Sequence, residues 1–167
     1  MSKSIPAIGQ AWPEQGGIYI GTRLIDGAVH HVVIPGGVEH DIKDVAFKGV
    51  QTCIPTELNG QGDWRAPDQE DLMLAWINAR EHFEKKGIAS VYWSRTERGD
   101  WAWAVDFENG NTNNNNRNNE FRVRPFRISH REFLWIQATR SKSWCRRIST
   151  AAGTNAIPPA RSDSSRS

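Results

Sequence analysis

Asparagine dominates one short segment of the chain: eight of the eleven residues from Asn109 to Asn119 are Asn. Each side-chain amide offers donors and an acceptor but almost no apolar area that folding could bury. We therefore expect these side chains to lie on an exposed surface that neighbouring elements support. The alternative is a solvated, disordered low-complexity loop.

Side chains that could do other chemistry are few and scattered. The sequence contains no GxSxG and no HExxH motif, and no Ser, His and Asp residues can be placed together as a triad. His30 and His31 are adjacent, so on a strand they would point to opposite faces and could hardly share one metal ion. We expect polar histidines on a strand, no metal site, no cofactor and no enzymatic activity.

The two cysteines give no framework for a metal or a set of disulfides. Cys53 and Cys145 form no CxxC motif and lie far apart in the chain. A single bridge between them is possible in principle, but a reducing compartment fits this usage better.

Two segments with strand-like alternation flank the Asn segment, which we define as residues 109–119. Residues 101–107 place Trp103, Val105 and Phe107 on one face and small or polar residues on the other, which predicts a half-buried strand. Residues 121–126 repeat the pattern, with Arg122 and Arg124 pointing away from the apolar face. Asn109-Gly110 predicts a type I′ turn, because both residue types tolerate positive φ.

The rest of the domain supplies the elements that must hold this region. Residues 17–21 and 29–34 read as strands joined by a turn at Asp26-Gly27, and a short strand or turn is expected near residues 45–47. Asp68 is a candidate N-cap with Asp71 at the capping-box position, and apolar residues at helical spacing follow. A basic last turn and Gly87 predict that this helix spans about 68–86.

Several ordered motifs resemble a bacterial and phage domain family of C-type-lectin-like fold, which shares its fold with formylglycine-generating enzymes. The motifs, which cover roughly residues 11–127, are Asp63-Trp64-Arg65-Ala66-Pro67, Tyr92-Trp93-Ser94 with Thr96-Glu97, Ala102-Trp103, Val105-Asp106-Phe107, Gly110 and Val123-Arg124-Pro125-Phe126-Arg127. The Asn segment resembles the variable region of proteins that diversity-generating retroelements mutate, a class that includes phage tropism determinants. The resemblance implies an α+β fold of mostly antiparallel strands and hairpins with one main helix.

The resemblance also implies which positions vary. Reverse transcription in that class miscopies template adenines, and AAC codons for Asn are the main targets. Arg, Asp, Ser and Thr can be reached from AAC, whereas Trp, Glu, Lys and Gln cannot. Trp101, Trp103, Glu108 and Glu120 should therefore be fixed, while Arg95 stands where the family often has Ser and fits a diversified position.

Function is then expected to reside in a variable region within residues 92–127. The candidate ligand-binding residues are Arg95, Arg98, Asp100, Asp106, Asn109, Asn111, Asn113, Asn114, Asn115, Asn116, Asn118 and Asn119. Trp101 is a candidate surface contact, and an ion pair between Arg117 and Glu120 is a candidate for stabilising the loop. The expected partner is a macromolecular ligand, either a cell-surface protein or a glycan, with attachment to a phage tail or another carrier through the tail or the N-terminal region.

The motifs of related catalysts and sugar lectins do not occur. A formylglycine-generating enzyme needs a cysteine pair at its active site, and residues 1–127 contain one cysteine. The Glu-Pro-Asn, Gln-Pro-Asp and Trp-Asn-Asp signatures of calcium-dependent lectins are also missing. A formylglycine-type enzyme and a fixed-sequence interaction domain remain the alternatives.

Charge divides the 167 residues into a mildly acidic domain and a basic tail. Residues 1–126 carry 13 Lys and Arg against 17 Asp and Glu, and residues 127–167 carry 8 against 2. We expect residues 1–127 to form the domain and residues 128–167 a basic tail with a disordered Pro- and Ser-rich end, for which nucleic-acid binding is not favoured. The N-terminus has no apolar stretch typical of a signal peptide, and no segment approaches the roughly 20 apolar residues of a membrane span, so a cytoplasmic or virion protein is expected.

Overall fold

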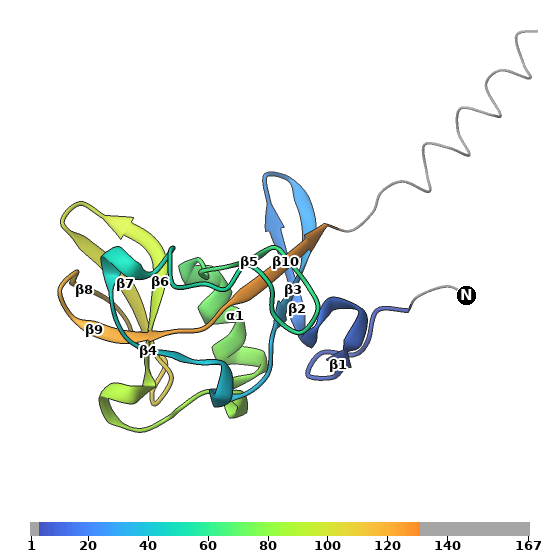
Figure 1. The fold of residues 1–167 in the computed structure, drawn as a ribbon, viewed down its shortest axis with the longest axis horizontal. Helices are drawn as coiled ribbons and strands as arrows, with labels where there is room; N and C mark the ends of the chain where they lie inside the picture. The colour runs from blue at the N-terminus through green and yellow to red at the C-terminus, as the bar shows by residue number, and fades with distance from the viewer. Residues whose placement is uncertain (1–3, 131–167) are drawn as a thin grey trace, which may run out of the picture. The chain divides into compact units, whose positions relative to one another are not determined.

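A computed structural model describes residues 4–130, which form two five-stranded sheets and one α-helix (Figure 1). The fold is α+β with mostly antiparallel strands, as the sequence predicted. The expectations for Cys145 and for residues 131–167 of the basic tail, including its Pro- and Ser-rich end, concern residues outside the described range.

The first sheet brings the beginning and the end of the domain together. Its strand order is β1-β2-β3-β10-β5, and its strands are β1 (Ala11–Trp12), β2 (Gly17–Ile25), β3 (Ala28–Ile34), β5 (Trp64–Arg65) and β10 (Phe126–His130). The expected hairpin between β2 and β3 is confirmed, because Asp26 and Gly27 both have positive φ, 49° and 78°. β10 pairs with β3 and continues past Arg127.

The second sheet contains the Asn segment. Its order is β4-β9-β6-β7-β8, and its strands are β4 (Ile42–Ala46), β6 (Val91–Arg98), β7 (Trp101–Asp106), β8 (Thr112–Asn116) and β9 (Glu120–Val123). β6 and β9 run parallel, whereas the other neighbours in this sheet are antiparallel. β8 is an edge strand, so the Asn segment adds a strand to the sheet instead of forming a loop without regular structure.

The helix α1 (Gln69–Asn78) begins where the sequence predicted but ends earlier. The Asp71 carboxylate accepts a hydrogen bond of 2.9 Å from the Asp68 N–H, which confirms the capping box. The predicted end near residue 86 is wrong, because side chains of the core form hydrogen bonds with backbone groups of the segment that follows the helix. The Arg124 guanidinium donates to the His82 carbonyl, and the Glu84 N–H donates to the Tyr92 hydroxyl.

Short 3-10 helices complete the connections between these elements. They are η1 (Pro13–Gln15), η2 (Val38–His40), η3 (Phe47–Gly49), η4 (Arg80–His82) and η5 (Gly87–Ser90). Among residues 4–130, no helix combines the length and apolar character that crossing a membrane requires.

The helix packs against strands of both sheets. It contacts β2 on one side and β6 and β7 on the other, and side chains of all these elements share one buried cluster. Phe83, just beyond η4, stacks on Phe107 with ring centroids 4.0 Å apart and meets Tyr92 edge-on. The segment after the helix therefore contributes to the same core as the helix.

A second buried cluster covers the opposite side of the β6–β9 sheet, so β7 is not the half-buried strand that the alternation predicted. Ala102 and Ala104 are 0% and 2% exposed and pack in a cluster with Trp93 and Phe121. Val105, on the helix side, is also fully buried. Both faces are therefore covered at Ala104 and Val105, and the small residues Ala102 and Ala104 are as buried as the larger Val105.

Arg124 points away from the apolar face of its strand, as expected. It does not reach solvent, however, because its side chain lies in the interior and is 0% exposed. Its Nε donates to the Asp41 carboxylate at 2.6 Å, and its terminal nitrogens donate to the carbonyls of Gly36 and His82. The guanidinium also lies 4.4 Å from the centroid of the Phe83 ring. A buried charge with this many partners is costly to unpair, so Arg124 is a structural residue.

The two adjacent histidines of β3 belong to the interior as well. His30 and His31 are 6% and 5% exposed. The Nδ1 atom of His31 lies 3.2 Å from the Tyr19 hydroxyl, and its ring contacts Trp12 edge-on. Both histidines therefore lie on a strand, as expected, and the structure adds that they are buried.

Candidate functional site

The Asn segment lies against β7 in a regular antiparallel register. Asn116 is opposite Trp101 and Asn114 is opposite Trp103, so these four side chains share one face of the sheet. Trp101 is 46% exposed and Trp103 is partly exposed. The strand thus places amides directly beside indole rings on an accessible face.

The asparagine side chains are accessible along the whole segment. Seven of the eight are exposed and Asn115 is half-buried; the exposed ones are Asn109, Asn111, Asn113, Asn114, Asn116, Asn118 and Asn119. None of them belongs to a buried cluster of the domain. The expected exposure is therefore observed.

The turn into β8 is wider than the predicted two-residue type I′ turn. Only Gly110 has positive φ, 81°, and its N–H donates to the Asp106 carbonyl four residues back. A Cβ atom at Gly110 would lie 2.6 Å from the Trp76 ring of α1. The close approach of the helix therefore sets the shape of this turn, and the dipeptide Asn109-Gly110 could not reveal that contact.

Three of the amides stabilise the segment itself. The Oδ1 atom of Asn109 accepts from the N–H of Asn111 at 2.8 Å, and the Oδ1 atom of Asn116 accepts from the N–H of Asn118 at 2.9 Å. The Nδ2 atom of Asn115 donates to the Asn113 carbonyl. Such local bonds are those that Asx turns use, so these amides have a conformational role in addition to their exposure.

Arg117 anchors the segment to its surroundings, but not through Glu120 as the sequence suggested. Its guanidinium lies 3.1 Å from the Glu97 carboxylate and donates to the Gly99 carbonyl, and it lies over the Phe47 ring. The predicted pair fails because β8 runs beside β7, which brings the β6–β7 turn to the end of β8. Glu120 instead begins β9.

The turn between β6 and β7 adds charged side chains to the same surface. Arg98 and Asp100 are exposed, and the Arg98 guanidinium lies 5.7 Å from the centroid of the Trp103 ring. A cation over an indole face is attracted by the ring quadrupole, so this contact orients both groups.

Arg95 stands where the register of β6 and β7 shifts, between Trp93 and Glu97. Its Nε lies 2.6 Å from the carboxylate of Asp68, the N-cap of α1. Burial of the Asp68 carboxyl group would by itself raise its pKa, but hydrogen bonds and charges from Arg95, Arg65 and Arg23 outweigh this and lower the pKa to about 2. Arg95 is therefore tied to the helix start while its side chain remains 40% exposed.

Asp106 differs from the other candidate residues because its side chain is engaged within the fold. It is half-buried, and its Oδ1 atom accepts from the Ser90 hydroxyl at 2.5 Å and from the Glu108 N–H at 2.9 Å. These bonds fasten the end of β7 to η5.

The structure brings the remaining candidates together around strand β8 and the β6–β7 turn. Asn114 and Asn116 share the face of Trp101 and Trp103, whereas Asn113 and Asn115 lie on the opposite face of the strand. We call this surface the display face, and it comprises Arg95, Arg98, Asp100, Trp101, Trp103 and the exposed part of the Asn segment. Sequence reasoning assigned Trp103 to the interior and did not connect Asp68 with Arg95. The pairing of β7 with β8 was the missing information, because it requires knowing that the Asn segment is a strand.

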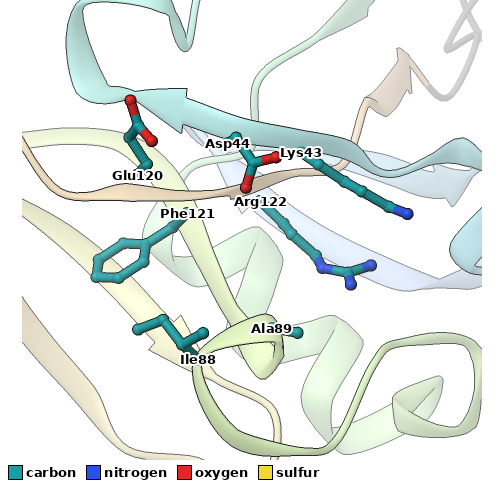
Figure 2. Close-up of a pocket in the computed structure, with 7 residues that line it drawn as sticks. All are labelled: Lys43, Asp44, Ile88, Ala89, Glu120, Phe121 and Arg122. Carbon is teal, nitrogen blue, oxygen red and sulfur yellow. The ribbon is translucent and has the colours of Figure 1, made fainter.

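A small hollow lies at the other edge of the same sheet (Figure 2). It has a volume of about 100 Å³ and is lined by side chains of β4, β9 and η5, namely Lys43, Asp44, Ile88, Ala89, Glu120, Phe121 and Arg122. A water occupies about 30 Å³ in the liquid, and pockets for small ligands start near 300 Å³. The hollow therefore suits a few waters, and it does not adjoin β8.

Among residues 4–130, the two sheets, the one α-helix and the accessible strand region fit a C-type-lectin-like domain. Residues 30–127, more than half of the chain, match the family model of the Lcl C-terminal domain. The chain therefore belongs to this family of C-type-lectin-like domains, which occurs in the variable proteins of diversity-generating retroelements. A comparison with curated proteins gave no match.

Proposed function

We propose that this protein is a ligand-binding module whose display face is diversified by mutation of adenines in its coding sequence. The ligand is a macromolecule of a cell surface, either a protein or a glycan, and the protein is carried on a phage particle or a comparable carrier. The family supports the coarser part of this proposal, a ligand-binding domain of the variable-protein type.

The observation that carries the proposal is the contrast in burial within one continuous stretch. Seven of the eight amides are exposed in a segment that the backbone pairing of β8 with β7 holds in place, whereas Phe121 and Val123 a few residues later are 6% and 0% exposed. Substitution at an exposed site away from special contacts typically changes stability by no more than about 0.5 kcal/mol. A surface of this kind can change its chemistry while the backbone that presents it stays ordered, which limits the entropic cost of binding.

Binding without catalysis is part of the proposal. Arg124 and Asp41, whose side chains are both 0% exposed, pair with each other in the interior. The rival enzyme hypothesis predicts turnover of a peptide thiol by the purified chain. Measurable turnover of such a substrate would favour that rival.

A display experiment tests the proposal directly. A yeast-displayed library randomised at Asn111, Asn113, Asn114, Asn118 and Asn119 is selected in parallel against a purified bacterial surface protein and a purified bacterial polysaccharide. A matched control library randomises exposed positions of the β2–β3 hairpin, namely Thr22, Leu24, Asp26 and Ala28. We expect specific binders from the first library and few from the control. Equal yields from both libraries would contradict the proposal.

The origin of the variation is tested at the level of the gene. We expect a reverse transcriptase gene nearby and a near-copy of the region encoding residues 92–127 that differs at adenines. A locus with neither feature would leave a binding surface of fixed sequence.

A further inference from the structure

The edge of β8 offers a second means of recognition besides its side chains. β8 is the terminal strand of its sheet, and among residues 4–130 no strand pairs with its outer side. An edge strand presents a row of backbone N–H and C=O groups that another extended chain can pair with.

The register determines which backbone groups point outward. The Asp106 N–H donates to the Asn111 carbonyl, so residues 106 and 111 form a hydrogen-bonded pair. In an antiparallel ladder such pairs alternate with non-hydrogen-bonded pairs. Thr112, Asn114 and Asn116 are therefore in non-hydrogen-bonded positions and direct their N–H groups away from β7. The carbonyl of Trp103, opposite Asn114, accepts from the Ser94 hydroxyl on the β6 side, as this alternation requires.

The other sheet edges carry features that discourage pairing. β1 and β5 are two residues long. β4 has an irregular register between Ile42 and Val45, positive φ at Asp44, and the charged side chains of Lys43 and Asp44 on its exposed part. Short strands, bulges and charges are the usual protection of an edge. β8 instead has five residues in unbroken register and no charged side chain.

We propose that β8 binds an extended segment of a polypeptide ligand as an added strand. The inference rests on the proposed function and narrows its ligand class from a surface macromolecule to a protein with an accessible extended segment. Backbone hydrogen bonds provide an affinity that is the same in every diversified variant, and the display-face side chains then select among segments. A second copy of this chain bound at β8 would cover the strand edge and the neighbouring Asn side chains in every variant, and no ligand could then reach them. We therefore assign the edge to a segment of the ligand.

The geometry also predicts the side chains of the ligand. An added strand would continue the face that carries Asn114, Asn116, Trp101 and Trp103, and every second ligand residue would lie on that face. Because Trp101 is 46% exposed, an apolar or aromatic residue at these alternate positions would gain contact area.

The test uses a random linear peptide library displayed on phage and selected against the full chain. Selected peptides are synthesised and their affinities are measured by calorimetry for the native chain, Asn114→Pro and Asn114→Ala. Proline is tolerated on an edge strand where its nitrogen faces outward, so Asn114→Pro removes one outward N–H without removing a bond to β7. Both variants lack the Asn114 amide, so the difference between them isolates the backbone N–H. We expect Asn114→Pro to bind the peptides at least tenfold more weakly than Asn114→Ala.

A second measurement leaves the protein unchanged. Peptides that are N-methylated at one residue at a time should lose binding at every second position only, because alternate N–H groups of an added strand point to its partner. Loss at every second position supports the added strand, and equal affinity for all N-methylated peptides overturns it.

The remaining outcomes separate the inference from the proposed function. If binding depends on Trp101 or Arg98 but is unchanged in Asn114→Pro, recognition uses side chains alone; the inference is then wrong and the proposed function stands. Selection of no peptide, together with binding on a glycan array, also overturns the inference alone. Self-association that Asn114→Pro abolishes assigns the edge to a second copy and overturns it. If the library randomised at the Asn positions also gives no binders, the proposed function fails as well.

Discussion

Strands β8 and β9 follow one another in the chain and lie in the same sheet, yet they depend on opposite kinds of side chain. β9 contributes Phe121 and Val123 to a buried cluster, and Arg124, just after it, is fully buried. β8 has no residue in a buried cluster and is held by its backbone pairing with β7 and by local amide bonds. The comparison shows that a strand can be well defined by its neighbours alone, without side chains that are fixed by packing.

Substitutions should therefore cost more stability in and just after β9 than in β8. In and after β9, a substitution creates a cavity or leaves a buried charge without its partner. In β8, most substitutions replace one solvated side chain with another.

Arg124→Ala should be the most destabilising of these changes. It removes one of the two arginines that pair with the buried Asp41 carboxylate, the other being Arg122, and leaves the carbonyls of Gly36 and His82 without this donor. Breaking a buried ion pair costs about 3–5 kcal/mol, and we expect a loss of that size in urea unfolding. Arg98→Ala, which removes an exposed arginine near β8, is the matched control and should cost less than about 1 kcal/mol. Similar losses for both variants would contradict the contrast.

Gly110→Ala tests the place where the Asn segment meets the helix. The φ of 81° costs an Ala residue about 1–2 kcal/mol, and the new Cβ would also lie 2.6 Å from the Trp76 ring. Gly27→Ala is the control, because Gly27 has a similar φ of 78° with nothing within 4 Å of the added Cβ. Thermal unfolding should show a larger loss for Gly110→Ala than for Gly27→Ala, and the difference measures the contact with Trp76. Equal losses would mean that Trp76 moves freely.

These two sites illustrate how much the sequence could reveal. The α+β class, the β2–β3 hairpin and the N-cap at Asp68 follow local rules of turn chemistry and capping, so the sequence predicted them. The burial of Arg124 and the early end of α1 depend on contacts between residues more than 40 positions apart, Arg124 with His82 and with Asp41. No periodicity or local motif encodes such contacts.

For the display face, the sequence predicted the exposure of the Asn side chains but not their strand conformation. Its exposure could be predicted because amides have little apolar area to bury. The strand conformation of β8 could not, because Asn has low β-propensity and the pairing with β7 overrides it. The side-chain roles of Asp106 and Arg117 also depend on partners that only the folded chain brings near, Ser90 and Glu97.

Arg95→Ser removes the guanidinium that pairs β6 with the N-cap of α1. Asp68 then loses the nearest of its arginines, and its pKa should rise from about 2 toward the ordinary value of 3.8. A carboxyl group whose pKa is lowered by folding adds stability above its unfolded pKa, and that stability is lost as the pH falls through the folded pKa. We expect a loss at pH 7 of less than about 1 kcal/mol, because the Arg95 side chain is 40% exposed.

The pH profile distinguishes this electrostatic effect from a general loss of packing. Between about pH 4 and pH 2 the stability of Arg95→Ser should fall less steeply than that of the native chain, and the two curves should converge near pH 2. An NMR titration of the Asp68 carboxyl carbon measures the pKa directly. Parallel stability curves and an unchanged pKa would show that Arg95 does not act through Asp68.

Substitutions within the Asn segment should have the smallest effects, and they should differ among themselves. The side chains of Asn114 and Asn119 are exposed, so Asn114→Ser and Asn119→Ser should change stability by less than about 0.5 kcal/mol. Asn116→Ala removes the side-chain acceptor for the Asn118 N–H and should cost about 0.5–1 kcal/mol, because a net hydrogen bond contributes about that much. Asn116→Asp keeps an acceptor in the same place and should restore most of the loss. Urea unfolding of the four variants at pH 7 checks this order; a loss above about 2 kcal/mol for Asn114→Ser would mean that an exposed amide is fixed by the fold, which the contrast between β8 and β9 excludes.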